Sequence, residues 1–404
     1  MNTIMEINDY TEEDMSNILK EYLNHHKKYT QKYGIQTIVI MNVGNWYEMY
    51  SVHNEEIKVG PDLKELSDIL NIQAVRRNKK NKTVSYDNFL MAGFPDHAYL
   101  KYRNILLNHN YTIIKVDQVT AAPNPERDVT EIISPATIID TFNQSDTNYL
   151  FSIYITNYPG PHGTKINTAG VSVIDIATGN NYVHRIKSSK EDQKIWDDEI
   201  YRLIQYYRPS EFIVHFDEKE FQFTKENLSQ MWSVKETCLH INLTTSKEYF
   251  KLSYQNEFLS HYFKSQDYVS PIESLGFERD TEITLSYIYM LQFIHEHKIE
   301  NTMSLHKPEF KHNQKYLLLS HNCVEQLNII DNPNSSSEKF SSLLSLLNKC
   351  STAIGRRLCK ERLLYPILNT DQLNERYNSI ELFQSKDNDK FIYELCDIEL
   401  RKII

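Results

Sequence analysis

The stretch IQTIVIMNVGNWYEMYSV (residues 35–52) joins a continuous apolar run to an aromatic-rich run through a Gly-Asn pair. A short apolar run bounded by turn residues is typical of a buried strand, so residues 35–43 are predicted to form one. Residues 46–52 are then either its continuation or its hairpin partner. Because side chains two positions apart on a strand share a face, Trp46 and Glu48 are predicted to project to the same side. A flat apolar ring and a carboxylate would therefore lie next to each other.

The segments around this stretch alternate between helix and strand signals. An amphipathic helix is expected before it, with Thr11 as its N-cap and Gly34 just past its end. Further helices are expected over 62–72 and 96–109, and a strand over 111–119. This alternation predicts a small mixed α/β domain over residues 1–132.

The segment MAGFPDHAY (residues 91–99) carries a glycine and a proline close together. Gly93 and Pro95 are predicted to form a turn, and Asp96 is predicted to cap the helix that follows. Met91 could still point at a ligand from such a turn.

A second α/β unit is expected after a polar linker over 134–148. Its elements are predicted as a strand at 149–158, two strands around a Thr-Gly turn at 169–186, a helix at 189–207 and a strand at 211–216. This pattern resembles a ribonuclease-H-like sheet, and the unit is assigned to residues 133–245. After residue 250 helical stretches dominate, at 281–297, 340–364 and 371–384, so residues 246–404 are assigned to a helical domain. The expected fold class is α/β followed by all-α.

Composition limits the class of protein. The 404 residues carry 44 Lys and Arg against 54 Asp and Glu, a net charge of -10, which argues against a polycation but leaves room for a local basic face. The five cysteines include no CxxC pair, which disfavours a disulfide framework or a zinc site and favours a reducing compartment. A polar, acidic N-terminus and the lack of a long apolar run predict an intracellular protein that is neither secreted nor membrane-spanning. No phosphate-binding GxxxxGK[ST] loop, GxGxxG, HExxH or GxSxG motif occurs.

Two features of the first domain have both a structural and a functional interpretation. Trp46 either fills a core beside a solvated Glu48, or stacks on a base while Glu48 contacts the base edge. The basic run RRNKKNK (residues 76–82) is either a solvated loop or a site that neutralises phosphates. The residues alone leave both alternatives open.

Asp175 in the second unit raises a third alternative. It occupies the position at which a ribonuclease-H-like nuclease would carry its first metal-binding carboxylate. Metal-dependent phosphodiester cleavage needs several convergent carboxylates, and only Asp217 and Glu218, at the end of a later predicted strand, are candidates to join it. A nuclease is therefore the weakest of the readings.

Taken in order along the chain, these stretches resemble the MutS family of DNA mismatch repair proteins. The family's Gly-x-Phe-Tyr-Glu motif is matched by GNWYE at residues 44–48, and its Met-Ala-Gly-Ile-Pro-x-His-Ala motif by MAGFPDHA at 91–98. Weaker matches are LNI at 70–72 followed by Arg76 and Arg77, SPAT at 134–137, IDIATG at 174–179, and SLLSLL at 342–347 followed by GRRL at 355–358.

The resemblance implies a mismatch-recognition domain, a connector domain and the start of a helical lever domain. It also implies that Trp46 wedges beside a mispaired base from the minor groove and that Glu48 hydrogen-bonds that base. Arg76 and Arg77 would contact phosphates or the minor groove, and Met91 would line the kinked step. Further phosphate contacts are expected from Lys79, Lys80 and Lys82. The implied partners are double-stranded DNA with mismatches, a second copy in the full-length protein, and repair proteins that bind the connector domain.

The sequence departs from the family pattern in two ways. Trp46 stands where Phe is usual, a feature that together with the lead-in KYGIQTIVIMNVG looks like the giant-virus and octocoral-mitochondrial branch. The family's ATPase domain with its Walker A loop is missing, so the chain is expected to be a fragment with no catalytic activity and no cofactor of its own. ATP and Mg²⁺ would belong to the missing domain of the full-length ATPase.

Two questions stay open beside the resemblance. The chain could instead be a non-catalytic binder of branched DNA, although relatives of that kind generally lack the aromatic-x-Glu pair. Its compartment is expected to be the cytoplasm, a viral factory or an organelle.

Overall fold

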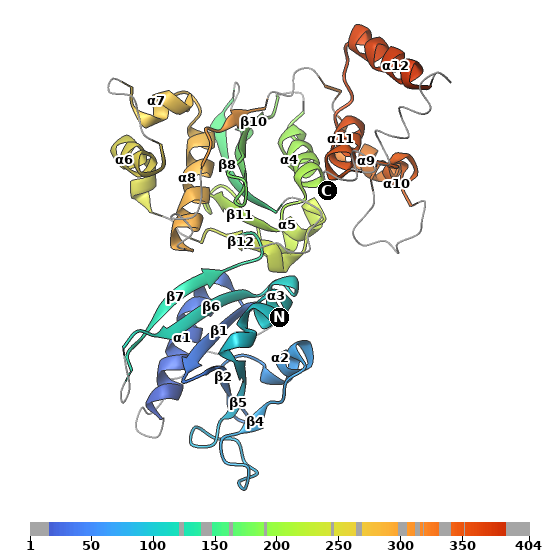
Figure 1. The fold of residues 1–404 in the computed structure, drawn as a ribbon. Helices are drawn as coiled ribbons and strands as arrows, with labels where there is room; N and C mark the ends of the chain where they lie inside the picture. Colours follow the sequence, from blue (N-terminus) through green and yellow to red (C-terminus); the bar gives the residue numbers. More distant parts are fainter. Residues whose placement is uncertain are drawn as a thin grey trace. The chain divides into compact units, whose positions relative to one another are not determined.

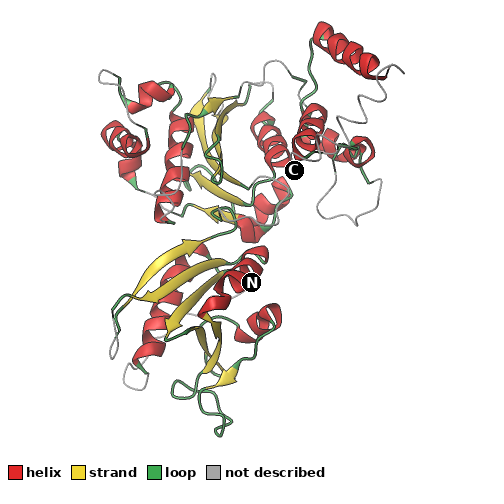
Figure 2. Ribbon diagram, viewed as in Figure 1, coloured by secondary structure: helices red, strands yellow, loops and turns green. Residues whose placement is uncertain are grey.

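The computed structural model describes residues 16–120, 125–138, 148–160, 165–189, 192–243, 246–263, 269–297, 305–311, 316–317, 319–330, 341–350 and 352–384. The chain divides into two compact units: Met1–Ile138 with Ile294–Asn301, and Ile139–Phe293 with Thr302–Ile404. Each unit is built around its own β-sheet with helices packed on it (Figure 1, Figure 2). The prediction of mixed α/β structure is confirmed, and the assignment of three domains stays a prediction.

The first unit contains a seven-stranded sheet in the order β4-β5-β2-β1-β6-β7, with β3 paired to β2. Its strands are β1 (Thr37–Val43), β2 (Trp46–His53), β3 (Lys58–Val59), β4 (Val75–Arg76), β5 (Leu90–Pro95), β6 (Thr112–Gln118) and β7 (Arg127–Ile133). β1 and β2 are antiparallel and joined at Gly44 and Asn45, so residues 46–52 are the hairpin partner and not a continuation. Gly44 has a φ of 61°, a left-handed conformation that glycine adopts without strain.

Helices cover both faces of this sheet. α1 (Asn17–Tyr33) lies on one face, where Tyr22 donates a hydrogen bond to the Val39 carbonyl at 3.0 Å and meets the ring of Tyr50 edge-on. α3 (Tyr99–Asn108) lies on the other face, where Tyr99 packs against Tyr47. α2 (Leu63–Leu70) packs beside α3 and begins at Asp62, whose carboxylate caps its first turn. The predicted end of α1 at Gly34 is confirmed, and its predicted start at Thr11 lies outside the described residues.

The predicted turn at Gly93 and Pro95 is wrong. Leu90–Pro95 forms β5, which pairs with β2 along its whole length. Gly93 serves this pairing, because a Cβ at its position would lie 2.6 Å from the Tyr47 carbonyl oxygen. Pro95 is the last residue of the strand, where its missing N–H removes little from the ladder. Asp96 accepts a hydrogen bond from the neighbouring His97 amide and begins a short 3₁₀ turn, Asp96–Ala98, that leads into α3.

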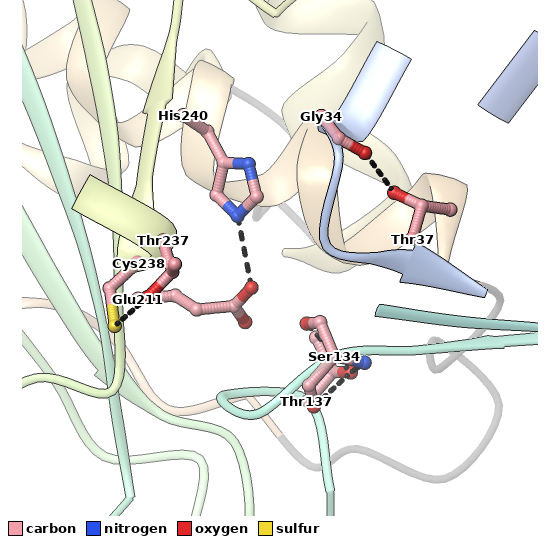
Figure 3. Close-up of polar contacts among 8 residues, drawn as sticks. All are labelled: Gly34, Thr37, Ser134, Thr137, Glu211, Thr237, Cys238 and His240. Carbon is pink, nitrogen blue, oxygen red and sulfur yellow. Dashed lines mark hydrogen bonds and ion pairs between the residues drawn. The ribbon is translucent and has the colours of Figure 1, made fainter. Parts of the chain in front are cut away.

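The first residues of the predicted linker belong to the first unit. Ser134 and Thr137, its first polar residues, are buried and close a tight turn (Figure 3). The Thr137 hydroxyl accepts a hydrogen bond from the Ser134 amide at 2.7 Å, and the Thr137 amide donates to the Ser134 carbonyl at 3.0 Å. Residues 134–138 therefore belong to the first unit, while 139–147 lie outside the described residues.

The second unit contains a six-stranded sheet in the order β12-β11-β8-β9-β10-β13. Its strands are β8 (Tyr149–Pro159), β9 (Lys165–Asp175), β10 (Asn181–Lys187), β11 (Glu211–Phe216), β12 (Leu239–Ile241) and β13 (Glu309–Phe310). The first three are antiparallel neighbours, whereas β11 runs parallel to β8 and β12 runs parallel to β11. The strands predicted from the sequence are confirmed. His240 on β12 and Glu211 on β11 form a buried pair, with 3.0 Å between Nε2 and Oε1 (Figure 3).

Two helices lie against opposite faces of this sheet. α4 (Ile195–Tyr207) packs on one face, where the Tyr207 hydroxyl is 2.9 Å from His184 Nε2. α8 (Thr281–Glu296) packs on the other, where the Ser286 carbonyl accepts a hydrogen bond from Ser152 and the Ser286 hydroxyl contacts Ser172. The remaining helices are α5 (Lys225–Trp232), α6 (Leu252–Tyr262), α7 (Pro271–Leu275), α9 (His321–Gln326), α10 (Leu343–Leu347), α11 (Ala353–Leu364) and α12 (Thr370–Gln384).

The single helical stretch predicted over 340–364 is instead two helices, α10 and α11. Asn348 ends the first, because its side-chain oxygen accepts a hydrogen bond from the Cys350 amide. Thr352 begins the second by accepting one from the Gly355 amide at 3.0 Å. Such side chains compete with helical backbone bonding, which is why the chain breaks here.

α8 approaches β9 so closely that Gly170 admits no side chain. A Cβ at Gly170 would lie 2.2 Å from the Glu282 carbonyl group and 2.5 Å from the Ile283 amide nitrogen. We expect Gly170→Ala to lower the free energy of unfolding of the second unit by about 3 kcal/mol, since neither backbone can yield cheaply. Hydrogen exchange of the β8 to β10 amides measures this unit separately from the first.

A control for this substitution is Lys187→Ala, at an exposed position on the neighbouring β10. It should change the stability by no more than about 0.5 kcal/mol. Equal protection of the strand amides in the two variants would contradict the close helix-to-strand contact.

Candidate nucleic-acid interface

Solvent exposure increases along one face of β2, from Tyr50 to Trp46. Tyr50 is 2% exposed, Glu48 is half-buried and Trp46 is 47% exposed. The three are spaced two residues apart on one strand, so they share a face, as predicted for Trp46 and Glu48. Tyr22 of α1 packs against Tyr50, which places all three on the α1 face of the sheet. Trp46 therefore does not fill a core.

The neighbouring strands complete this surface. Trp46 pairs with Val43 on β1 and with Pro95 on β5. Glu48 lies opposite Gly93, which has no side chain to cover it. A Cβ at position 93 would approach the Glu48 Cγ to 3.3 Å, so the glycine leaves room around the glutamate. Met91 pairs with Tyr50 and, as a directly opposed residue, lies on the same face.

The Glu48 carboxylate is held by its own strand. The Tyr50 hydroxyl donates a hydrogen bond to Glu48 Oε2 at 2.5 Å. No second donor to this carboxylate is found among the residues that the structure describes. One carboxylate oxygen is therefore bound and the other remains a free acceptor.

The structure separates the two arginines that the sequence places together. Arg76 pairs with Leu90 on β5 and lies on the face opposite Trp46. Its Nε is buried and has no hydrogen-bond partner in the part of the chain that the structure describes. Arg77 follows the end of β4, and its guanidinium lies 5.5 Å from the centre of the Phe89 ring. Since Phe89 packs edge-on against Tyr50, Arg77 reaches the face that carries Glu48, and Arg76 does not.

The basic loop, residues 78–87, follows the edge strand β4, and its Lys79, Lys80 and Lys82 are exposed. Buried Asn88 holds it from inside: its side-chain oxygen accepts from the Asn78 amide at 2.7 Å, and its amide group donates to the Asn81 and Thr83 carbonyls. Asn54 donates to the Val84 carbonyl at 2.9 Å. The loop backbone is therefore organised by two asparagine side chains.

Sequence reasoning missed Asn88. The signal was an asparagine between a polar loop and an apolar strand, where side-chain bonding to the backbone is common. In a chain with many asparagines, that signal singles out no position.

Asp175 has a structural task. It is buried at the end of β9, where its carboxylate accepts a hydrogen bond from the Ala177 amide and its backbone closes the turn with Gly179 and Asn180. Asp217 caps the Lys219 amide. Within the described ranges no group of three or more His, Cys, Asp or Glu side chains could hold a metal ion. The described helices also include none that is long and apolar enough to cross a membrane.

Comparison with known families gives two matches. The model for MutS domain I matches residues 18–141, which include the whole surface described above. The model for MutS domain III matches residues 322–402. Together the two matches cover about half of the chain.

Relatives along most of the chain have the same description. A mutS homolog of Acanthamoeba polyphaga mimivirus, named as a DNA mismatch repair protein, is 31% identical over 89% of this chain and 34% of its own length. MutS of Borrelia garinii is 26% identical over 92% of this chain and 38% of its own length. The mitochondrial mutS homolog of the octocoral Sarcophyton glaucum is 23% identical over 93% and 41%. This chain thus spans little more than a third of the length of these relatives.

Among solved structures, the similarity to a DNA polymerase is too low to indicate a shared fold. A family B DNA polymerase from Pyrobaculum calidifontis aligns with 65% of this chain and 45% of its own, at 10% identity and a TM-score of 0.19. The two family models and the relatives instead agree on one family, and the mimivirus and octocoral proteins agree with the branch expected from the sequence. The chain belongs to the MutS family of DNA mismatch repair proteins.

Proposed function

We propose that the first unit binds mismatched or unpaired bases in double-stranded DNA from the minor groove, as part of a longer mismatch repair protein. Trp46 is the wedge that enters the base stack, and Glu48 is the acceptor that hydrogen-bonds the displaced base. The observation that carries this proposal is an exposed indole beside a half-buried carboxylate on one face of a strand.

The wedge selects mismatches through the energy of the DNA. Opening a base step costs a few kcal/mol and is cheapest where pairing is already weak. Stacking of an aromatic side chain on a base returns about 1–3 kcal/mol. The two terms are similar in size, so wedging is favourable at a mispair and unfavourable at a matched step.

Glu48 adds discrimination of a different kind. A carboxylate brought close to phosphates is repelled unless it gains a hydrogen bond. A displaced base can offer an N–H donor to the free oxygen of Glu48, whereas a paired base keeps its Watson–Crick donors in the pair. The carboxylate therefore favours the mismatched duplex by penalising the matched one.

The basic loop supplies affinity without sequence preference. Its exposed lysines are placed to neutralise phosphates, and binding should then weaken with rising salt. Arg77 is proposed to contact a phosphate or the minor groove, because it lies on the Glu48 side of the sheet. Met91 shares that side and is proposed to line the opened step. Arg76 is proposed to contact phosphates at most through its outer atoms, since its Nε is buried on the opposite face.

Residues 133–245 are proposed to form the connector domain, and residues 246–404 to begin the helical lever domain. Three antiparallel strands continued by two parallel ones support a ribonuclease-H-like connector. We assign ATP and Mg²⁺ binding, dimerisation and contacts with other repair proteins to the whole protein. We also propose that the protein acts in an intracellular compartment. Branched-DNA binding is the alternative, and the exposed Trp46 with its adjacent acid favours mismatches over it.

Trp46→Ala should reduce the ratio of affinities for a G·T duplex over its matched counterpart by at least about fivefold, because stacking contributes about 1–3 kcal/mol per base. Salt-sensitive binding to both duplexes should persist. Fluorescence anisotropy with labelled duplexes of the two kinds, and with a four-way junction of equal length, measures the ratio and tests the branched-DNA alternative.

The controls for this experiment are Trp46→Phe and Leu100→Ala. The first keeps an aromatic wedge and should keep most of the ratio; the second removes another exposed apolar side chain, 58% exposed on α3. If Trp46→Ala and Leu100→Ala discriminate as well as the parent chain, Trp46 is no wedge.

Replacing the three loop lysines by glutamine should weaken binding to matched and mismatched duplexes alike. The slope of log affinity against log salt should become shallower by up to about 3, one for each lost phosphate contact. The substituted residues are Lys79, Lys80 and Lys82.

A triple variant with the same loss of charge serves as the control. It replaces exposed lysines of the second unit by glutamine: Lys219, Lys235 and Lys247. A slope that changes equally in both triple variants would indicate a general charge effect. It would contradict the proposed contact between the basic loop and DNA.

A further inference from the structure

The Tyr50 hydroxyl lies directly behind the proposed base-reading group. It donates to Glu48 Oε2 at 2.5 Å, two residues along the same strand. We propose that Tyr50 is a positioning residue, which orients the Glu48 carboxylate before DNA binds and reserves one of its oxygens for the base. This inference rests on the proposed function of Glu48.

Packing holds the Tyr50 ring in one place. It is 2% exposed and is met edge-on by two other rings, that of Tyr22 at 5.1 Å and that of Phe89 at 5.2 Å between centres. Tyr22 is itself tied to the sheet through its hydrogen bond to the Val39 carbonyl. A tyrosine has two side-chain torsions, and the rings packed on it from α1 and from the residue just before β5 leave its hydroxyl little freedom.

The hydroxyl acts as a donor toward Glu48. Burial and then the hydrogen bond with Glu48 raise the pKa of Tyr50 well above its usual range, so the phenol stays protonated. The bond runs from the phenol O–H to a carboxylate oxygen, which accepts it. Hydrogen bonds to a charged group are among the stronger ones in proteins, and this one keeps Oε2 occupied.

Orientation before binding removes part of the entropy that a flexible side chain otherwise loses on binding. A free glutamate near the surface samples several rotamers, and fixing it disfavours binding. Here the opposite neighbour, Gly93, leaves the space around Glu48 open while Tyr50 fixes the carboxylate from the core side. Tyr50 thus holds the Glu48 side chain in place, and the free side of the carboxylate is open where a nucleobase would approach.

Tyr50→Phe isolates this effect, because it removes only the hydroxyl from a well-packed ring. We expect the ratio of affinities for G·T over matched duplex to fall about fivefold, with matched-duplex affinity and the unfolding midpoint nearly unchanged. Fluorescence anisotropy and thermal unfolding of the full chain measure these quantities.

Tyr47→Phe is the matched control. It removes a hydroxyl from the other buried tyrosine of β2, which lies on the opposite face of that strand and donates to Asp117 of β6 at 2.8 Å. It should leave the affinity ratio as it is. A fivefold loss in this variant as well would show that any buried hydroxyl of β2 matters and would overturn the assignment to Tyr50.

A double-mutant cycle separates positioning from general support of the fold. Glu48→Ala should lower the ratio, and adding Tyr50→Phe to it should lower the ratio no further. If Tyr50→Phe has its full effect without Glu48, or none with it, Tyr50 does not act through Glu48, and the proposed function stands. If Glu48→Ala leaves the ratio unchanged, the base-reading role itself is wrong, and the inference falls with it.

Discussion

The pairing of β2 between β1 and β5 is the constraint on which the first unit depends. A strand bonded on both edges cannot shift by one residue without turning every side chain to the other face. This register puts Tyr47 with α3 and sends Trp46, Glu48 and Tyr50 to the α1 face. The exposure of Trp46, the partial burial of Glu48 and the burial of Tyr50 therefore all follow from the pairing of β2 with β1 and β5.

The same ladder explains where sequence reasoning succeeded and failed. The two strands, α2, α3 and the shared face of Trp46 and Glu48 depend on local periodicity, which the sequence carries directly. The sequence left open whether β2 continues β1 or pairs with it as a hairpin. The turn expected at Gly93 and Pro95 was wrong because local turn preference lost to pairing with β2 across more than forty residues. Gly93 instead allows the backbones of β5 and β2 to approach each other closely.

Parts of the site were beyond prediction for related reasons. Which face Arg76 and Arg77 occupy depends on the register of β4 with β5, two short partners far from any strong periodic signal. The bond from Tyr50 to Glu48 needs a rotamer that only packing against Tyr22 and Phe89 selects. A family resemblance predicts which residues form a motif. It does not predict the packing and hydrogen bonds that hold their side chains in place.

Under the proposed function, the arrangement separates affinity from discrimination. The loop lysines would attract every phosphate backbone equally, so they would raise binding to matched and mismatched DNA together. A fixed carboxylate opposes that attraction unless a base supplies a donor, and a rigid one opposes it more consistently than a side chain that can rotate away. Under the proposed function, selectivity would come as much from the repulsion between Glu48 and the phosphates as from the stacking of Trp46 on a base. Anchoring the acid to the core through Tyr50 lets β2 keep a charge near the proposed path of the DNA, where an unsupported glutamate would simply turn to solvent.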